Sequence, residues 1–292
     1  MSVIINKAGF MTTVQDGGRP GFGHIGIPAS GYMDRDAAHV ANVMVNNNPD
    51  TALLEVDVAG IVFTSQVACS VAVSGAKASV LLNQIPQNTG QTIHLKPDDR
   101  FEIKTLTDGM WCYLAFAGGI QCEPILGSCS TLLVAKLGGH EGRRLQKNDV
   151  LILRKPAIVK TQIKPRHKRP PHNTIHSLAA LPGPEYDLFT QASRQNIIAK
   201  PFAMTENISR QGMKITGPKL ATKSQVNLIS SGLVPGSLQV TPAGECIITH
   251  RDSQTTGGYP RITVLKRQTL NQLAQVRPGE QIYFYMDHES RP

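Results

Sequence analysis

Short runs of alternating apolar and polar residues are the feature that most constrains this chain. They are clearest at residues 61–67, 70–74, 79–82 and 111–115, and turn residues separate them. Successive side chains on a β-strand point to opposite faces, so this period of two predicts strands buried on one side. Many short strands with few, short helices predict a mainly β protein built from barrels or sandwiches.

Three segments repeat one local plan, at residues 95–104, 145–154 and 276–285. Each has an apolar residue, a tight turn with an acidic residue, and then an alternating strand. The turns contain Pro, Asn, Asp or Gly, which supply the dihedral angles that a chain reversal needs. The repeat predicts the same hairpin geometry three times, and it is too short to establish a duplicated domain.

Two segments are predicted to be helices. Residues 34–45 carry an apolar stripe at helical spacing, and Asp34 can cap the first turn. Residues 181–195, which have Pro-Gly-Pro near their start, are the second candidate.

The positive charge is concentrated in one segment. The formal net charge is +9, and residues 150–184 contain seven Lys and Arg but no acidic residue. With Pro170 and Pro171, this composition predicts a solvated linker at residues 156–174. We therefore expect a β-rich domain at residues 1–155 and another at 175–292. Basic charge without a recognisable nucleic-acid-binding module argues against a nucleic-acid partner.

The apolar runs and the N-terminal residues predict where the protein is located in the cell. No apolar run approaches the ~20 residues of a membrane span, and the N-terminal residues lack the pattern of a signal peptide. We expect a cytoplasmic protein without a membrane partner.

The five cysteines are odd in number and form no Cys-x-x-Cys pair, which argues against a disulfide scaffold or a zinc site. Most are expected to be small buried side chains, with Cys129 as the exception in its polar, glycine-flanked stretch.

Four stretches combine glycine with polar side chains, at residues 12–34, 127–145, 209–218 and 252–261. Glycine lets backbone N–H groups approach an anion or an amide closely. Arginines suit anions, amide and hydroxyl groups suit a substrate amide, and carboxylates suit a base or an oxygen-ligated metal. The candidates are Arg19, Arg143, Gln15, Gln254, Thr255, Tyr259, Asp16, Asp34 and Glu55.

Structural roles remain open for several of these residues. Asp16 before two glycines is typical of a turn, Asp34 of a helix cap, and residues 257–260 of a tight turn between strands. None of the stretches is a Walker A loop, a Gly-x-Gly-x-x-Gly fingerprint or a His-Glu-x-x-His helix, and the nine histidines show no metal-binding spacing.

The motifs Thr13-Val-Gln-Asp-Gly-Gly-Arg-Pro-Gly, Gly31-Tyr-Met-Asp, Gly138-Gly-His-Glu-Gly-Arg and Gln254-Thr-Thr-Gly-Gly-Tyr-Pro-Arg occur in this order. Together they resemble the carboxyltransferase-type family that includes the C subunit of 5-oxoprolinase, the KipA protein and the carboxyltransferase part of urea amidolyase. The resemblance extends from Gly9 to about Tyr285. It implies two cyclophilin-like β-barrel domains around a shared cleft.

The resemblance also implies an activity. A member would work with a KipI-like B subunit and a third, LamB/YcsF-like subunit as a 5-oxoprolinase that uses ATP and Mg²⁺ to open 5-oxoproline, a lactam, to glutamate. Motif membership implies catalytic roles and substrate-binding roles. The catalytic set is Asp16, Asp34, Arg143 and Tyr259, and the substrate-binding set is Gln15, Arg19, Glu55, Gln254 and Thr255.

Two other activities stay open within the same family. One is a carboxyltransferase that acts on urea or a similar amide with a biotin carrier in trans. The other is a KipA-type antagonist of a histidine-kinase inhibitor. Gly212-Met-Lys-Ile mimics a biotin-attachment tetrapeptide, but Lys214 stands where the family has arginine, so we expect no covalently bound biotin.

The sequence departs from the family pattern at three places. Cys129 stands where the pattern has arginine in Gly-Ser-Arg-Ser-Thr, His140 replaces a phenylalanine, and Met213-Lys214 replaces Tyr-Arg. Losing one guanidinium and exchanging another for an ammonium removes bidentate contacts. These changes leave open a different acidic substrate or weakened catalysis.

Overall fold

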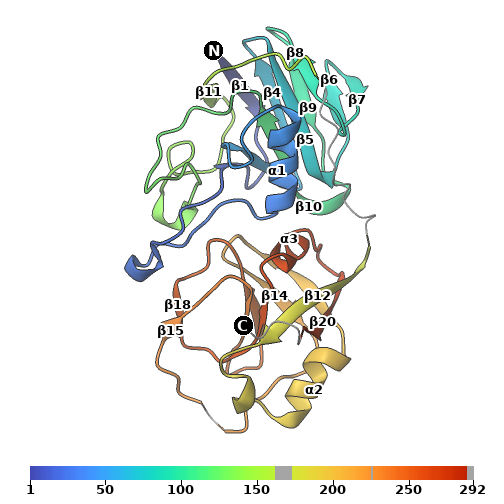
Figure 1. The fold of residues 1–292 in the computed structure, drawn as a ribbon. Coiled ribbons are helices and arrows are strands. Elements are labelled where there is room, and N and C mark those ends of the chain that lie inside the picture. The colour runs from blue at the N-terminus through green and yellow to red at the C-terminus, as the bar shows by residue number, and fades with distance from the viewer. Residues whose placement is uncertain (162–172, 225, 288–292) are drawn as a thin grey trace. The chain divides into compact units, whose positions relative to one another are not determined.

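The chain forms two compact units in a computed structural model, which describes residues 1–161, 173–224 and 226–287 (Figure 1). The first unit consists of Met1–Arg19 and Ser30–His172, and the second of Pro20–Ala29 and Asn173–Pro292. The glycine-rich stretch at residues 12–34 is therefore divided between the two units. Most of the predicted linker, residues 162–172, lies outside the described residues.

The first unit contains two antiparallel sheets. Its strands are β1 (Ser2–Lys7), β2 (Thr13–Gln15), β3 (Leu53–Val56), β4 (Ile61–Ser65), β5 (Cys69–Lys77), β6 (Val80–Leu82), β7 (Ile85–Gln87), β8 (Ile93–Leu95), β9 (Arg100–Ile103), β10 (Asp108–Phe116) and β11 (Val150–Ile152). One sheet has the order β11-β1-β4-β9-β6-β7 and the other β2-β3-β10-β5-β8. The four runs of alternating residues coincide with β4, β5, β6 and β10, as predicted.

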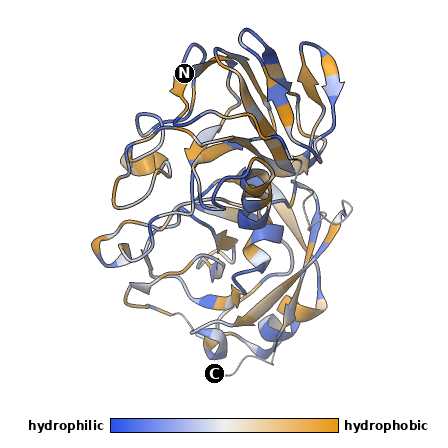
Figure 2. Cartoon of the chain, turned by 45° about the horizontal axis from the view of Figure 1, so that its top comes forward, coloured by the Kyte–Doolittle hydropathy of each residue, from blue (hydrophilic) through white to orange (hydrophobic). Residues whose placement is uncertain are grey.

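A hydrophobic core fills the first unit. Phe63 belongs to this core, and its ring centroid is 5.1 Å from that of Phe101 and 5.5 Å from that of Phe116. Apolar and polar residues alternate along several strands of this unit (Figure 2). Helix α1 (Arg35–Met44) lies against β5 and β10. A 3₁₀ turn, η2 (Leu133–Ala135), lies in the glycine-rich stretch at residues 127–145.

The second unit is a closed barrel with the strand order β12-β19-β16-β17-β14-β13-β20. The barrel closes because its first and last strands, β12 and β20, pair in parallel. Its strands are β12 (Ile175–Pro182), β13 (Phe202–Ile208), β14 (Gly212–Thr216), β16 (Ser237–Val240), β17 (Cys246–Thr249), β19 (Arg261–Leu265) and β20 (Gln281–Met286). A separate ribbon pairs β15 (Ser231–Gly232) with β18 (Thr256–Gly257).

The short helices of this unit are α2 (Gln191–Ala199), α3 (Thr269–Leu273), η1 (Gly23–Ile25) and η3 (Tyr186–Leu188). The prediction of a mainly β protein with few helices is confirmed. The barrel expected in each half is observed as a closed barrel in the second unit and as two antiparallel sheets in the first.

One helix prediction is confirmed and the other is wrong in its extent. The Asp34 carboxylate accepts a 3.1 Å hydrogen bond from the Ala37 N–H and caps α1. The segment 181–195, by contrast, starts inside β12, which ends at Pro182. Helix α2 begins only after Thr190, whose hydroxyl accepts from the Ser193 N–H at 3.1 Å. The Pro-Gly-Pro sequence thus ends a strand instead of starting a helix.

The repeated turn is confirmed three times. Its fourth residue has a positive φ in each copy, at Asp98 (68°), Asn148 (72°) and Gly279 (84°). The carboxylate of the fifth residue accepts a hydrogen bond from the backbone N–H of the second residue at 2.7, 2.8 and 2.9 Å. These positions need a residue that tolerates left-handed backbone and an acceptor one place later, which is the pattern that the sequence repeats.

Candidate functional site

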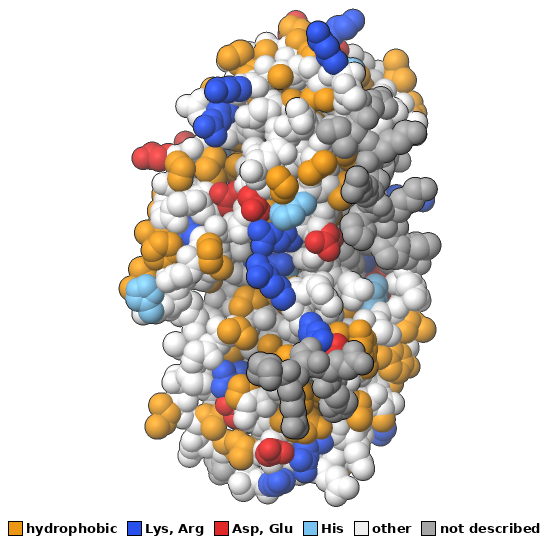
Figure 3. All heavy atoms as spheres, viewed as in Figure 1, with side chains coloured by type: hydrophobic (Ala, Val, Ile, Leu, Met, Phe, Trp, Pro, Cys, Tyr) orange, Lys and Arg blue, Asp and Glu red, His pale blue; other side chains and the backbone are white. Residues whose placement is uncertain are grey.

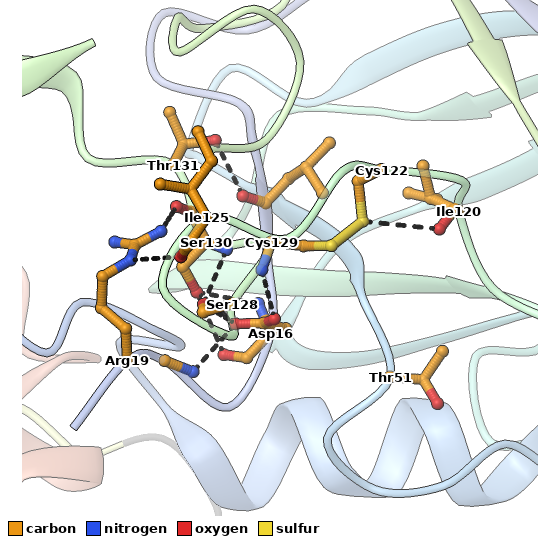
Figure 4. The surroundings of a disulfide bond; sticks show 12 residues. Asp16, Arg19, Thr51, Ile120, Cys122, Ile125, Ser128, Cys129, Ser130 and Thr131 are labelled. Atoms are coloured by element: carbon orange, nitrogen blue, oxygen red, sulfur yellow. Dashed lines mark hydrogen bonds between the residues drawn. A yellow bond between two sulfur atoms is a disulfide. The ribbon is translucent and has the colours of Figure 1, made fainter. Parts of the chain in front are cut away.

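The carboxylate of Asp16 is held by four neutral donors (Figure 4). Its Oδ1 accepts from the Ser128 hydroxyl at 2.5 Å, the Ser130 hydroxyl at 2.6 Å and the Gly18 N–H at 2.9 Å. Its Oδ2 accepts from the Cys129 N–H at 2.6 Å. We call Asp16 and residues 128–130 the Asp16 clamp. It joins two glycine-rich stretches that are more than a hundred residues apart in the sequence.

Gln15 and Arg19 strengthen the same junction. Gln15 is fully buried, and its side-chain N–H₂ donates to the Thr131 carbonyl at 3.1 Å. Its Oε1 is buried without a hydrogen-bond partner among the described residues. Arg19 is 1% exposed and donates to the carbonyl oxygens of Ser130 and Ile125. Both side chains therefore connect residues 15–19 to the segment around the clamp.

Two glycines allow the chain to pass close to the clamp. A Cβ on Gly138 would meet the Ser130 carbonyl oxygen at 2.2 Å, and one on Gly139 would meet the Thr131 hydroxyl at 1.9 Å. Both residues also have a positive φ. Only glycine fits both requirements, which explains the Gly-Gly pair of the motif at residues 138–143.

The cysteines differ from the prediction at two positions. Cys122 and Cys129 form a disulfide whose Cα atoms are 5.9 Å apart, within the range that a bridge needs. The other three cysteines, Cys69, Cys112 and Cys246, are free and buried, as expected. The chain turns back between residues 122 and 129, and this brings together two cysteines that have no recognisable spacing motif.

A cavity of about 490 Å³ lies beside the disulfide in the first unit. Its lining includes Asp16, Cys122, Cys129, Asp50 and Arg154. Asp50 forms an ion pair with Arg35, which donates to both of its carboxylate oxygens at 3.1 and 3.2 Å. The cavity thus combines acidic groups, a basic group and the disulfide.

Glu55 and Asp34 meet through Tyr113. The Tyr113 hydroxyl donates to Glu55 Oε2 at 3.0 Å and accepts from the Asp34 N–H at 2.7 Å. Glu55 Oε2 also accepts from the Met33 N–H at 2.7 Å. Burial and the neighbouring charges of Glu55 and Asp34 hold the pKa of Tyr113 well above its usual value. The Tyr32 N–H donates to the Asp16 carbonyl at 3.3 Å, which links this group to the Asp16 clamp.

Arg143 lies in an ion-pair cluster built on one of the repeated turns. It donates to both Asp149 oxygens at 2.7 and 2.9 Å and to Glu141 at 2.8 Å. His140 Nε2 is 3.5 Å from Asp149. Burial opposes ionisation of Asp149, but its bonds to Arg143 and the Gln146 N–H and the nearby charges outweigh burial and lower its pKa. His140, which replaces the phenylalanine of the family pattern, therefore lies beside the Asp149 carboxylate of the chain itself.

The second unit holds Gln254, Thr255 and Tyr259 around the β15–β18 ribbon. The Thr255 carbonyl accepts from the Leu233 N–H at 2.8 Å, while Gln254 and Tyr259 are exposed, Tyr259 by 44%. A Cβ on Gly23 would lie 3.9 Å from the Thr255 methyl group. Part of the first glycine-rich stretch thus lies beside the fourth within this unit.

Two ion pairs support that ribbon and the adjacent barrel strands. Arg210 and Asp252, which are 2% and 4% exposed, form two hydrogen bonds of 2.8 and 3.1 Å. Arg261 forms two bonds to Glu185, at 2.7 and 2.6 Å, and one to the Gly232 carbonyl at 2.6 Å. The third and fourth glycine-rich stretches are therefore joined by the Arg210–Asp252 pair.

Lys214, the lysine of the biotin-like tetrapeptide, lies within barrel strand β14. Its Nζ is 2.5 Å from Glu245 Oε1. The tetrapeptide is therefore part of a paired strand, between β13 and β17.

Sequence reasoning missed Ser128 and Ser130, the hydroxyl donors of the clamp. Their spacing of two on either side of Cys129 was the available signal, since alternate residues of an extended segment point the same way. Within the ranges that the structure describes, no group of three or more His, Cys, Asp or Glu side chains could hold a metal ion. No helix in these ranges is long and apolar enough to cross a membrane.

The fold and the ordered motifs define a class of protein, the β-rich carboxyltransferase-type domains. A family model described as "Carboxyltransferase domain, subdomain A and B" matches residues 25–286, and the chain belongs to this family. The resemblance seen in the motifs is thereby confirmed.

The relatives narrow this class. The chain is 36% identical over 280 residues to the 5-oxoprolinase C subunit of Escherichia coli, a match that covers 96% of this chain and 89% of the relative. It is 33% identical to the 5-oxoprolinase C subunit of Haemophilus influenzae, over 93% of this chain and 87% of the relative. Urea amidolyase of Lachancea kluyveri is 29% identical over 96% of this chain, but only 16% of its own length is matched.

Solved structures show the same fold. The urea amidolyase of K. lactis superimposes with a TM-score of 0.91 at 27% identity, covering 97% of this chain and 18% of that chain. The protein TTHA0988 superimposes with a TM-score of 0.88 at 29% identity, covering 97% of this chain and 55% of that one. The chain thus corresponds to one part of these longer proteins.

Proposed function

We propose that this chain acts as the C subunit of an ATP-dependent 5-oxoprolinase, which opens 5-oxoproline to glutamate. The observation that carries the proposal is the 36% identity to the E. coli 5-oxoprolinase C subunit over 96% of this chain. The name of that relative implies further subunits, and we propose a KipI-like B subunit and a LamB/YcsF-like subunit as the partners. Because the reaction consumes ATP, we place the assembly in the cytoplasm, without a nucleic-acid or membrane partner.

The reaction needs ATP for a chemical reason. A lactam is a resonance-stabilised amide whose carbonyl resists attack by water, and phosphorylation of its oxygen supplies a leaving group. We assign no residue here to ATP or Mg²⁺. The chain's contribution is to bind and orient a small amide. We propose that it carries no covalently bound biotin.

The burial of the candidate residues supports a division of roles. Tyr259 is exposed and Asp16 lines the cavity, which suits contact with a substrate. Gln15, Arg19 and Glu55 are buried, which suits positioning of the segments around them. Asp34 caps α1, and we propose that with Glu55 it fixes the Gly31–Asp34 segment beside Asp16. Gln254 and Thr255 would orient the amide, and Arg143 would neutralise an anionic group.

The fold supports a finer proposal. We propose that both units are cyclophilin-like barrels, the first with its strands divided between two sheets. The shared cleft implied by the resemblance stays a prediction.

The test is glutamate release from 5-oxoproline with ATP and Mg²⁺. The chain is assayed alone, with its KipI-like partner, and with both partners, and we expect turnover only in the full mixture. Arg143→Ala and Tyr259→Phe should lower kcat, whereas the neighbouring Arg144→Ala and the similarly exposed Tyr285→Phe should not. A stable assembly of all three proteins that releases no glutamate would contradict the proposal.

A second candidate rests on the urea amidolyase matches, which extend over 96% and 97% of this chain. In that case the chain would transfer a carboxyl group to urea from a biotin carrier. Carboxylated biotin carrier with urea should then be consumed by the chain without the 5-oxoprolinase partners. The two functions are distinguished by whether glutamate or a carboxylated amide is formed.

A further inference from the structure

We propose that the Cys122–Cys129 disulfide is a reversible redox site, opened by a dithiol reductant of the thioredoxin class, that controls the order of the Asp16 clamp. The bridge and the clamp share a residue. The backbone N–H of Cys129 donates to Asp16, and its neighbours Ser128 and Ser130 supply the two hydroxyl donors (Figure 4).

The bridge is accessible from one side. Cys122 is partly exposed, whereas Cys129 is only 8% exposed, and both line the cavity of about 490 Å³. All five residues from Glu123 to Gly127 are exposed. A thiolate can therefore reach the Cys122 sulfur, while Cys129 is almost completely buried.

The exchange balances in two steps. A thiolate of the reductant attacks the Cys122 sulfur, the bond between the two cysteine sulfurs breaks, and Cys129 leaves as a thiolate that takes up a proton. The second thiol of the reductant then attacks the mixed disulfide and releases Cys122 as a thiol. Two electrons and two protons pass to the chain, and the reductant ends as a disulfide.

Opening the bridge affects a segment with few other anchors. Between the cysteines, the backbone forms a reciprocal pair of hydrogen bonds, at 2.9 and 3.2 Å, that joins Ile125 and Ser128. The Ile125 carbonyl also accepts from Arg19. Without the bridge, the Asp16 clamp holds residue 129, but residue 122 is no longer tied to it. The segment 123–127 gains freedom next to the cavity, and the clamp bonds of Ser128 and Cys129 open more often.

The remaining cysteines do not compete in this exchange. Cys69 and Cys246 are 0% and 3% exposed, and burial raises the pKa of each thiol to about 11. Cys112 is fully buried as well. Because exchange requires an accessible thiolate, these three thiols stay unreactive in the folded chain.

The first part of the test measures reduction of the folded protein with thioredoxin, thioredoxin reductase and NADPH. We expect one NADPH oxidised per chain and alkylation of Cys122 and Cys129 alone, identified by mass spectrometry. The Cys122→Ser/Cys129→Ser variant should oxidise no NADPH, and Cys246→Ser should behave as the parent. Reduction only after addition of denaturant would overturn the proposal.

The second part measures the clamp without relying on the proposed function. Limited digestion with subtilisin should cut within residues 123–127 about five-fold faster after reduction, since cleavage follows local opening. With or without reductant, the double serine variant should be cut at the faster rate expected for the reduced parent. Reoxidation with glutathione disulfide should restore the slow rate in the parent. Equal cleavage of the oxidised and reduced forms would overturn control of the clamp, whatever the substrate of the enzyme is.

Discussion

The Asp16 region of the first unit and the ribbon region of the second unit hold their candidate residues together by different means. In the first unit, Asp16 is held by four neutral donors and the segment beside it by a disulfide. In the second unit, Arg210–Asp252 and Arg261–Glu185 are bidentate ion pairs. Neutral donors fix geometry through short contacts, while ion pairs depend on both charges being present. The first region should therefore respond to shape and redox state, and the second to charge and pH.

Exposed apolar side chains occur in both regions, at Ile125 and Leu126 in the first and at Ile229 and Val234 in the second. Figure 3 shows apolar side chains dispersed among polar ones over the face in view. Scattered apolar side chains are normal on protein surfaces, so the comparison of the two regions rests on their internal bonds.

The largest effect is expected for Arg210→Ala in the second unit. Removing the guanidinium leaves the Asp252 carboxylate 4% exposed and without its bidentate partner. Loss of one member of a buried pair costs about 3–5 kcal/mol in the free energy of unfolding. Urea denaturation measures it, and the matched variant Arg210→Met/Asp252→Leu should recover part of the loss. A loss below about 1 kcal/mol would show that the pair is not what holds this region.

Gly139→Ala tests the close packing of the first unit. The new Cβ would meet the Thr131 hydroxyl at 1.9 Å at a backbone φ of 56°. We expect a loss of about 2–3 kcal/mol, from overpacking and backbone strain. Gly127→Ala is the control, because it also has a positive φ (77°) but open space around its Cβ. It should cost about 1 kcal/mol. Equal losses in the two variants would contradict the role of packing.

Asp16→Asn tests the neutral clamp. An amide can accept on one side only, so at least one of the donors from Ser128, Cys129 and Ser130 loses its acceptor. We expect a loss of about 1–3 kcal/mol in unfolding free energy, together with faster subtilisin cleavage in residues 123–127. Asp50→Asn, which changes an exposed carboxylate at the same cavity, should leave the cleavage rate unchanged. Loss of stability that disappears in 1 M salt would instead indicate a charge effect.

The smallest effect concerns pH in the second unit. Burial favours protonation of Glu185, but its bonds to Arg261 and the arginine's charge outweigh burial and hold its pKa below the usual value. The pair therefore stabilises the fold above the unfolded-state pKa of about 4.3 and loses this contribution as the pH falls through the lower folded-state value.

Glu185→Gln should flatten this acid dependence by about 1 kcal/mol between pH 6 and pH 3, as measured by urea unfolding. The stabilities of the variant and the parent should approach each other as the pH falls through the folded-state pKa of Glu185. An unchanged pH profile would mean that the Glu185–Arg261 pair does not stabilise the second unit. Asp149→Asn is the matching substitution in the first unit, since its pKa is also lowered through Arg143.

Local patterns in the sequence predicted what depends on neighbouring residues. The repeated turn needs a residue that tolerates positive φ and an acceptor one place later, and both lie within six residues. Helix α1 begins at its predicted cap, Asp34, and strands β4, β5, β6 and β10 follow the alternating runs. The ordered motifs identified the family because their spacing is readable in the chain itself.

The tertiary structure decided which side chains become partners. Asp16 and Ser128 are 112 residues apart, and Arg261 and Glu185 are 76 residues apart, so no window of sequence contains both partners. Arg143 has a motif position, but its binding to Asp149 follows from the turn that presents that carboxylate. The disulfide depends on a chain reversal that brings two Cα atoms to 5.9 Å. The sequence specifies the chemistry of each side chain. The folded backbone determines which other group comes within bonding distance of it.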